Sequence, residues 1–96
     1  MPAPPLPYGT LVAMAAERIS RLLRAGDRDP PLPHGGTPAE WALAAGLGCA
    51  PHAAITDPPL DIAPHDAESL ALVACRRLTQ RGELQHQRGR YMRRPR

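Results

Sequence analysis

The residues best suited to chemistry in this sequence are the arginines that crowd its C-terminal end. From Arg76 onward there are eight Arg and one acid, Glu83, whereas residues 1–75 hold four Arg and eight acids, so the two parts carry formal charges of +7 and −4. Guanidinium groups bind phosphate through paired hydrogen bonds. The asymmetry therefore indicates a polyanionic partner, most often nucleic acid, although solubility or a protein partner would also explain it.

A second group with possible chemistry contains two Cys and two His. Cys49 and His52 stand close together, and His65 and Cys75 could complete a set of four zinc ligands. Structural zinc is usually bound by two close ligand pairs, which this spacing does not supply. Cys75 lies within an apolar run, which is typical of a buried free thiol. We expect reduced cysteines and no metal site.

Catalysis would need a nucleophile beside a base, or paired carboxylates within a pocket. The candidates are Cys49 with His52 and Asp57 with Asp61, and neither pair belongs to a recognised motif. We therefore expect a protein without enzymatic activity and without a cofactor.

The length of 96 residues allows one domain with a modest core. The apolar content comes mostly from Ala and Leu, which favour helices, and Trp41 is expected in the core. Gly35-Gly36 stands alone in a proline-rich stretch and makes no phosphate-binding loop. No segment approaches the roughly 20 apolar residues of a membrane span, and the first residues lack the pattern of a signal peptide. We expect a cytoplasmic protein that does not contact the membrane.

Twelve of the thirteen prolines fall in three clusters, and these clusters leave three segments with apolar residues at helical spacing. The clearest start signal is Thr37-Pro38-Ala39-Glu40, with a capping Thr, a Pro at the first position and a Glu at the third. The predicted helices and their capping residues are 10–25 with Thr10, 38–46 with Thr37, and 66–81 with Asp66. The charged face of the first helix is expected to be solvated and contains Glu17, Arg18, Arg21 and Arg24.

A hairpin signal follows the third predicted helix. Gly82 ends that helix, and two short segments follow that are joined at Arg88-Gly89, where Gly tolerates the positive φ of a tight turn. With one further helical turn considered over residues 51–56, the prediction is a mainly α domain of three or four helices with a C-terminal β-hairpin. The predicted organisation is a Pro-rich arm at 1–9, a single domain at 10–94 with its hairpin at 83–94, and a tail at 95–96.

A helix that ends Leu78-x-x-x-Gly82-x-Leu84 and is followed by Gly89-Arg90-Tyr91 resembles the recognition helix and wing of winged helix-turn-helix DNA-binding domains. The resemblance implies that Leu78 and Leu84 face the core. It also implies that the third helix enters the major groove while wing arginines meet phosphate or the adjacent minor groove. The residues expected to bind double-stranded DNA are Arg76, Arg77, Gln80, Arg81, Arg88, Arg90, Arg93 and Arg94.

The first half of the predicted recognition helix is poorly suited to reading bases. Phosphates would repel Glu68, and Ala71 with Leu72 resembles a second buried face. The arginines are therefore expected to hold the DNA backbone rather than to read its sequence. The expected function is a small transcriptional regulator or accessory nucleic-acid-binding factor, either monomeric or homodimeric. The alternative is a non-enzymatic protein interaction module or homodimer with a basic tail.

Overall fold

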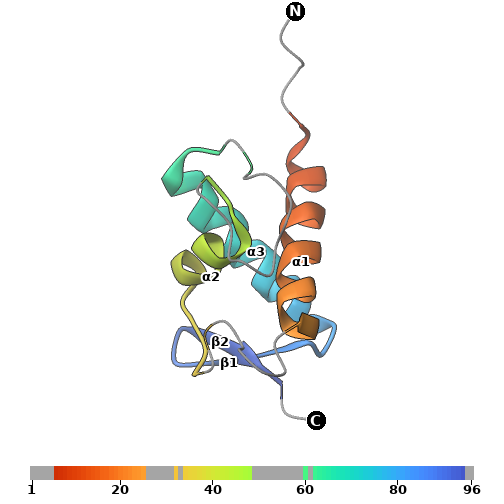
Figure 1. The fold of residues 1–96 in the computed structure, drawn as a ribbon, viewed down its shortest axis with the longest axis vertical. Helices are drawn as coiled ribbons and strands as arrows, with labels where there is room; N and C mark the ends of the chain where they lie inside the picture. Colours follow the sequence, from red (N-terminus) through yellow and green to blue (C-terminus); the bar gives the residue numbers. More distant parts are fainter. Residues whose placement is uncertain (1–5, 26–31, 33, 49–59, 61, 95–96) are drawn as a thin grey trace, which may run out of the picture.

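Three helices followed by a two-stranded antiparallel hairpin make up the described part of the chain (Figure 1). The computed structural model describes residues 6–25, 32, 34–48, 60 and 62–94, so the helical turn considered over residues 51–56 lies outside them. The elements are α1 (Tyr8–Ala25), α2 (Pro38–Ala45), α3 (Pro64–Gln80), β1 (Leu84–Gln87) and β2 (Arg90–Arg93). The prediction of a mainly α fold with a C-terminal β-hairpin is confirmed.

The predicted capping box at the start of α2 is present. The Thr37 hydroxyl accepts a hydrogen bond from the Glu40 N–H at 3.3 Å, and the Glu40 carboxylate accepts one from the Thr37 N–H, also at 3.3 Å. Pro38 occupies the first helical position, where the missing N–H costs no hydrogen bond. The helix ends at Gly46, whose φ of 76° is unfavourable for residues with a Cβ. Local sequence therefore defines both ends of α2.

The caps predicted for the two longer helices are wrong. Thr10 lies inside the first turn, because α1 begins at Tyr8. α3 begins at Pro64, with Ala63 at the cap position and no side-chain cap bond. Because proline lacks an N–H it is favoured at the first helical position, so the helix starts ahead of Asp66. Asp66 instead lies in the first turn, where the helix dipole favours a carboxylate.

The core is formed by the inner sides of the helices and one face of the hairpin. α1 and α3 pack against each other, and both bury small side chains, including Ala15, Ala71 and Ala74. Small side chains allow helix axes to come close. The side chains that were predicted to face the core are all buried, namely Trp41, Leu78 and Leu84. Among the helices of the described residues, none is both long and apolar enough to cross a membrane.

Arg18 does not lie on the solvated face that was expected for it. Its exposed fraction is 3%, and its Nη1 donates a hydrogen bond to the Ala45 carbonyl at 3.2 Å. That carbonyl belongs to the last turn of α2, where backbone oxygens lack helical partners and attract a cation. Arg18 therefore joins α1 to α2. Arg24 does lie at the surface, and its Nη2 is 3.2 Å from Oε1 of Glu17.

α2 and α3 also pack together, although a long segment separates them in the sequence. The Gly48 N–H donates to the Leu60 carbonyl at 2.8 Å, and the Leu60 N–H donates to the Gly46 carbonyl at 3.0 Å. These two bonds return the chain to the end of α2 shortly before α3 begins. The length of the connection therefore does not prevent the two helices from pairing in space.

The hairpin turns at Arg88-Gly89, as predicted. The two residues have φ values of 52° and 77°, and a two-residue type I′ turn requires positive φ at both positions. Across the strands, His86 lies opposite Tyr91 with the ring centres 4.5 Å apart. Leu84 and Tyr91 are buried, so one face of the hairpin packs against the helical body.

The backbone of Tyr91 attaches the hairpin to the helices. Its N–H donates to the Gly36 carbonyl at 2.7 Å, and its carbonyl accepts from the Gly36 N–H and from Trp41 Nε1, both at 2.9 Å. Gly35 permits this close approach, because a Cβ at that position would lie 3.0 Å from the Cβ of Met92. Gly35-Gly36 therefore has a structural role as the segment that pairs with β2.

We predict that Trp41→Phe weakens the attachment of the hairpin. Phe keeps an aromatic ring in the core but removes one of the two donors to the Tyr91 carbonyl, so the free energy of unfolding should fall by about 1–3 kcal/mol. Urea denaturation measures the loss, and hydrogen exchange should show faster exchange at the hairpin amides.

The matched control is Tyr8→Phe, which removes a polar atom from an aromatic side chain that is 57% exposed. That variant should change the free energy of unfolding by less than about 0.5 kcal/mol. Equal stability of Trp41→Phe and the parent protein would contradict the role given to this hydrogen bond.

Candidate functional site

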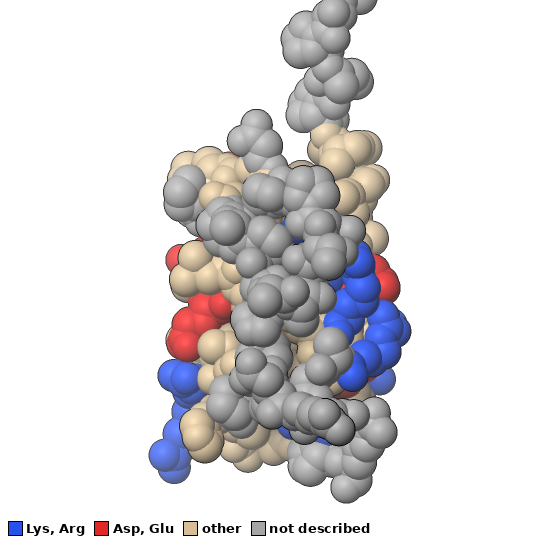
Figure 2. Space-filling model, viewed as in Figure 1, with Lys and Arg blue, Asp and Glu red and all other residues tan. Residues whose placement is uncertain are grey.

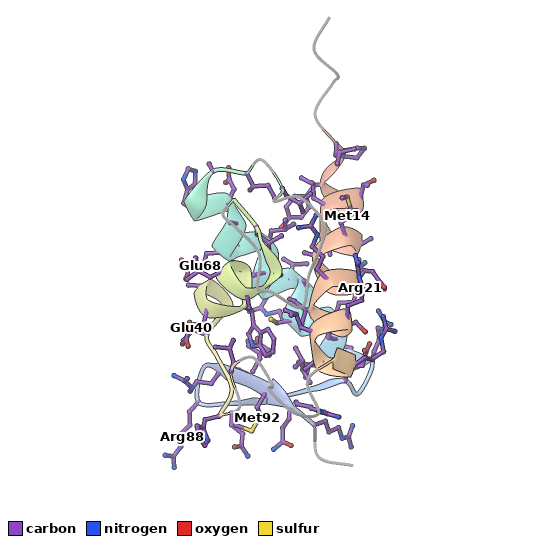
Figure 3. All side chains as sticks on the ribbon, viewed as in Figure 1. Met14, Arg21, Glu40, Glu68, Arg88 and Met92 are labelled. Carbon is purple, nitrogen blue, oxygen red and sulfur yellow. The ribbon has the colours of Figure 1, made fainter. Side chains whose placement is uncertain are left out.

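The polar residues predicted to bind nucleic acid occupy three places near the end of the chain. Most of them are exposed, and Arg93 is half-buried. They lie in the C-terminal part of α3 (Arg76, Arg77 and Gln80), at the base of the hairpin (Arg81, Arg93 and Arg94) and at its tip (Arg88 and Arg90). Figure 2 shows basic side chains at the lower left corner of the molecule and a further basic group on its right side; Figure 3 places Arg88 at the lower left, pointing away from the helices, and Arg21 on the right.

A glycine shapes the junction between α3 and the hairpin. Gly82 has a φ of 82° and follows the end of the helix, as predicted, while the Glu83 N–H donates to the Leu78 carbonyl at 2.9 Å. This left-handed turn satisfies a carbonyl at the end of the helix. A Cβ at Gly82 would lie 3.3 Å from Nη1 of Arg94. The junction therefore brings the residue that follows β2 close to the end of α3.

Glu83, the one acid in the basic stretch, is engaged in holding this junction. Its carboxylate accepts a hydrogen bond from the buried hydroxyl of Ser20 in α1, and its Oε2 lies 3.0 Å from Nη2 of Arg81. The pattern of the sequence does not reveal the first contact, because 63 residues separate the two partners. Arg81 is thus partly neutralised, and its side chain helps to fix the base of the hairpin.

Arg90 is directed back toward α2 rather than into solvent alone. Its Nη2 donates to the Gly35 carbonyl at 2.8 Å and lies 3.7 Å from Oε1 of Glu40, the acid of the capping box. Arg90 therefore links the hairpin tip to the start of α2. Part of its charge is compensated by that carboxylate, a contact that no local sequence motif indicates.

Four of the predicted arginines are exposed and pair with no carboxylate within the residues that the structure describes. They are Arg76, Arg77, Arg88 and Arg94. Each guanidinium carries five N–H donors in a planar fork that matches the geometry of phosphate or carboxylate. These four arginines, which lie at the end of α3 and on the hairpin, are therefore the candidates for binding an anion.

The N-terminal half of α3 has a different chemistry. Glu68 is exposed, and Oδ1 of Asp66 lies 3.4 Å from Nε2 of His65. Ala71 is fully buried, as expected for a second buried face, whereas Leu72 remains half-buried. This half of the helix offers acidic and apolar atoms where base contacts would require hydrogen-bond donors and acceptors.

The acids form a border beside the hairpin tip. Figure 3 shows Glu68 and Glu40 on the same side of the molecule as Arg88, one above the other, and the space-filling view shows acidic atoms above the basic corner. A polyanion would be attracted to the basic corner and repelled by the acids above it. The charge arrangement therefore favours contact at the end of the molecule rather than along the whole of α3.

The other candidate groups are only partly described. Cys49 with His52 and Asp57 with Asp61 lie outside the described residues, and within those residues no group of three or more His, Cys, Asp or Glu could hold a metal ion. A cavity of about 410 Å³ opens between the N-terminal parts of α1 and α3, remote from the basic end of α3. Its mostly apolar lining consists of Tyr8, Leu11, Ile62, Ala63, Asp66, Ser69 and Leu70.

Cys75 is the buried free thiol that the sequence predicted. Burial raises its pKa from 9.0 to about 12, because a thiolate would lose its hydration in this environment. The thiol is therefore protonated at neutral pH. It lacks the thiolate character that a catalytic or redox cysteine needs.

Comparison of the chain with protein-family models, with curated proteins and with solved structures finds no match.

The raised pKa of Cys75 predicts a loss of stability at high pH. Because the folded pKa lies above the unfolded value, the contribution is fully present below pH 9.0 and is lost as the pH rises toward about 12. Over that window the free energy of unfolding should fall by about 1.4 kcal/mol per pH unit. Urea titrations at steps of about one pH unit between pH 8 and pH 11 would measure how the free energy of unfolding changes with pH. They would use a Cys49→Ser background, where Cys75 is the only thiol.

Cys75→Ala in the same background is the control, and its slope should be flatter even if its absolute stability is lower. Identical slopes for the two proteins would show that the thiol remains accessible to water in the folded state.

Proposed function

We propose that this protein binds double-stranded DNA through the hairpin and the C-terminal end of α3, in the manner of a winged helix-turn-helix domain. The observation that carries the proposal is the set of exposed arginines that have no described carboxylate partner, Arg76, Arg77, Arg88 and Arg94. The remaining residues of the predicted surface are Gln80, Arg81, Arg90 and Arg93. A small transcriptional regulator or accessory factor is the biological role we propose, and a cytoplasmic location stays a prediction of the sequence.

The arrangement of the elements supports the resemblance to a winged helix. α2 packs on α3, and α3 leads through Gly82 directly into a hairpin whose tip carries Arg88. In such domains one helix lies in a groove while the wing contacts the backbone beside it. Here the wing and the helix end are basic and the beginning of the helix is acidic. The proposed contact is therefore mainly with phosphates.

Phosphate contacts make a clear prediction for salt dependence. Each neutralised phosphate releases condensed counterions, so the logarithm of the binding constant should fall linearly with the logarithm of the salt concentration. For Arg88→Ala combined with Arg94→Ala we expect weaker binding to all duplex sequences alike. The slope should become shallower by up to about two units, if both side chains touch phosphate.

Fluorescence anisotropy with duplexes of unrelated sequence, at several salt concentrations, measures both quantities. Arg21→Ala combined with Arg24→Ala is the charge-matched control, because it removes two arginines from α1, where they lie beside Glu17. Affinity that does not depend on salt, absence of binding at low salt, or an equal loss in the control variant would each reject the proposal.

Glu40→Gln should strengthen DNA binding. Gln can still accept the capping-box bond from Thr37, so α2 keeps its cap, while the charge that compensates Arg90 is removed. Exposed ion pairs are worth about 0.2–1 kcal/mol, and we therefore expect affinity to rise about twofold to fivefold at low salt. Anisotropy titration measures the gain, and a thermal melt should show little change.

The gain should shrink when Arg90→Ala is combined with Glu40→Gln, because the released cation is then absent. Unchanged or weaker binding by the Glu40→Gln protein, with its fold intact, would show that Arg90 does not contribute to the DNA surface.

A further inference from the structure

α3 carries a stripe of exposed and half-buried side chains, and its central residue, Leu72, also packs against the core with part of its surface. The residues of the stripe follow one another at intervals of three or four, which places them along one side of a helix. They are His65, Glu68, Leu72, Arg76 and Thr79. His65, Glu68 and Arg76 are exposed, and Leu72 and Thr79 are half-buried. The stripe therefore offers one apolar side chain at its centre, an acid on one side of it and a base on the other.

The stripe is symmetric in spacing about Leu72 and complementary in charge. Glu68 stands four residues before Leu72 and Arg76 four residues after it, so each lies about 6 Å from the centre along the helix axis. If a second α3 packed antiparallel across Leu72, each Glu68 would lie against the Arg76 of the other copy. A twofold axis makes such a contact twice, since the same patch is used by both chains.

Both charged groups lack a partner in the described chain. No ion pair is formed by Glu68 or by Arg76 within the described ranges, and about 12 Å of helix separates the two residues, which is too far for a direct contact. Their charges are therefore available to a second molecule. The complementary molecule must present a base where this one has an acid, and an acid where it has a base.

We infer that this face of α3 is the docking surface for a second copy of the same chain, packed antiparallel about Leu72. A contact built mainly from one helix pair buries less than about 1,200 Å² in total, which is typical of weak and reversible association. The dimer therefore exchanges with monomers.

The inference does not depend on DNA binding, but it has a consequence for it. Arg76 belongs both to this surface and to the proposed DNA surface, so a dimer covers it. Arg88 and Arg94 lie outside the stripe and stay accessible in either state. DNA and the second copy compete for the end of α3 alone.

Sedimentation equilibrium of the full chain without DNA, at low salt and up to about 1 mM protein, tests the inference. The parent protein should show a monomer–dimer equilibrium. Glu68→Arg alone, and Arg76→Glu alone, should each raise the dimer Kd by at least about tenfold, because like charges then face each other. Glu17→Arg, the same change of charge on α1, should leave the Kd unchanged.

Two rescues separate the docking geometry from a general charge effect. The double variant Glu68→Arg with Arg76→Glu restores opposite charges in each pair and should dimerise again. An equimolar mixture of the two single variants should form heterodimers for the same reason. A parent protein that stays monomeric at all concentrations, a Glu68→Arg protein that associates like the parent, or a double variant that fails to recover would overturn the inference.

Discussion

The position of every hairpin arginine depends on three hydrogen bonds at the backbone of Tyr91. A two-stranded hairpin of four-residue strands is marginally stable by itself, and this one has no β-branched residue to favour the extended conformation. The bonds from Gly36 and Trp41 fix β2 against the segment that leads into α2. Because the groups involved are buried, separating them would leave polar atoms without partners, at a cost of about 1–3 kcal/mol each. The hairpin is therefore a rigid extension of the helical body.

Two acids near the arginines, Glu83 and Glu40, help to hold the hairpin in place and also reduce the positive charge around it. Glu83 accepts a hydrogen bond from buried Ser20, and Glu40 closes the capping box with Thr37, so both carboxylates are fixed by neutral donors. Arg81 and Arg90 then pair with carboxylates whose positions are already set. These two arginines connect elements of the fold, whereas Arg76, Arg77, Arg88 and Arg94 extend toward solvent. Because the side chains of Arg81 and Arg90 are already held by carboxylates, they would lose less entropy if a ligand bound to them.

Features that depend on a few neighbouring residues could be predicted from the sequence. The capping box at Thr37, the helix end at Gly82 and the turn at Arg88-Gly89 are all determined by local backbone preference, and each is present. Caps were predicted wrongly where a proline competed, as at Pro64.

Contacts between residues that lie far apart in the chain leave no recognisable pattern in the sequence. Ser20 with Glu83, Arg18 with Ala45, and Gly36 with Tyr91 each join segments far apart in the chain. For this reason the basic stretch could be identified from composition, but not which of its arginines are already engaged. The same is true of α3. The order of its charged residues is visible in the sequence, but only the fold shows which of them are exposed. Acid, leucine and base succeed one another along that exposed side, an order that opposes phosphate at one end and attracts it at the other. On the proposed DNA-binding function, a polyanion would approach from the hairpin end, and the helix would contribute to binding only with its last turns.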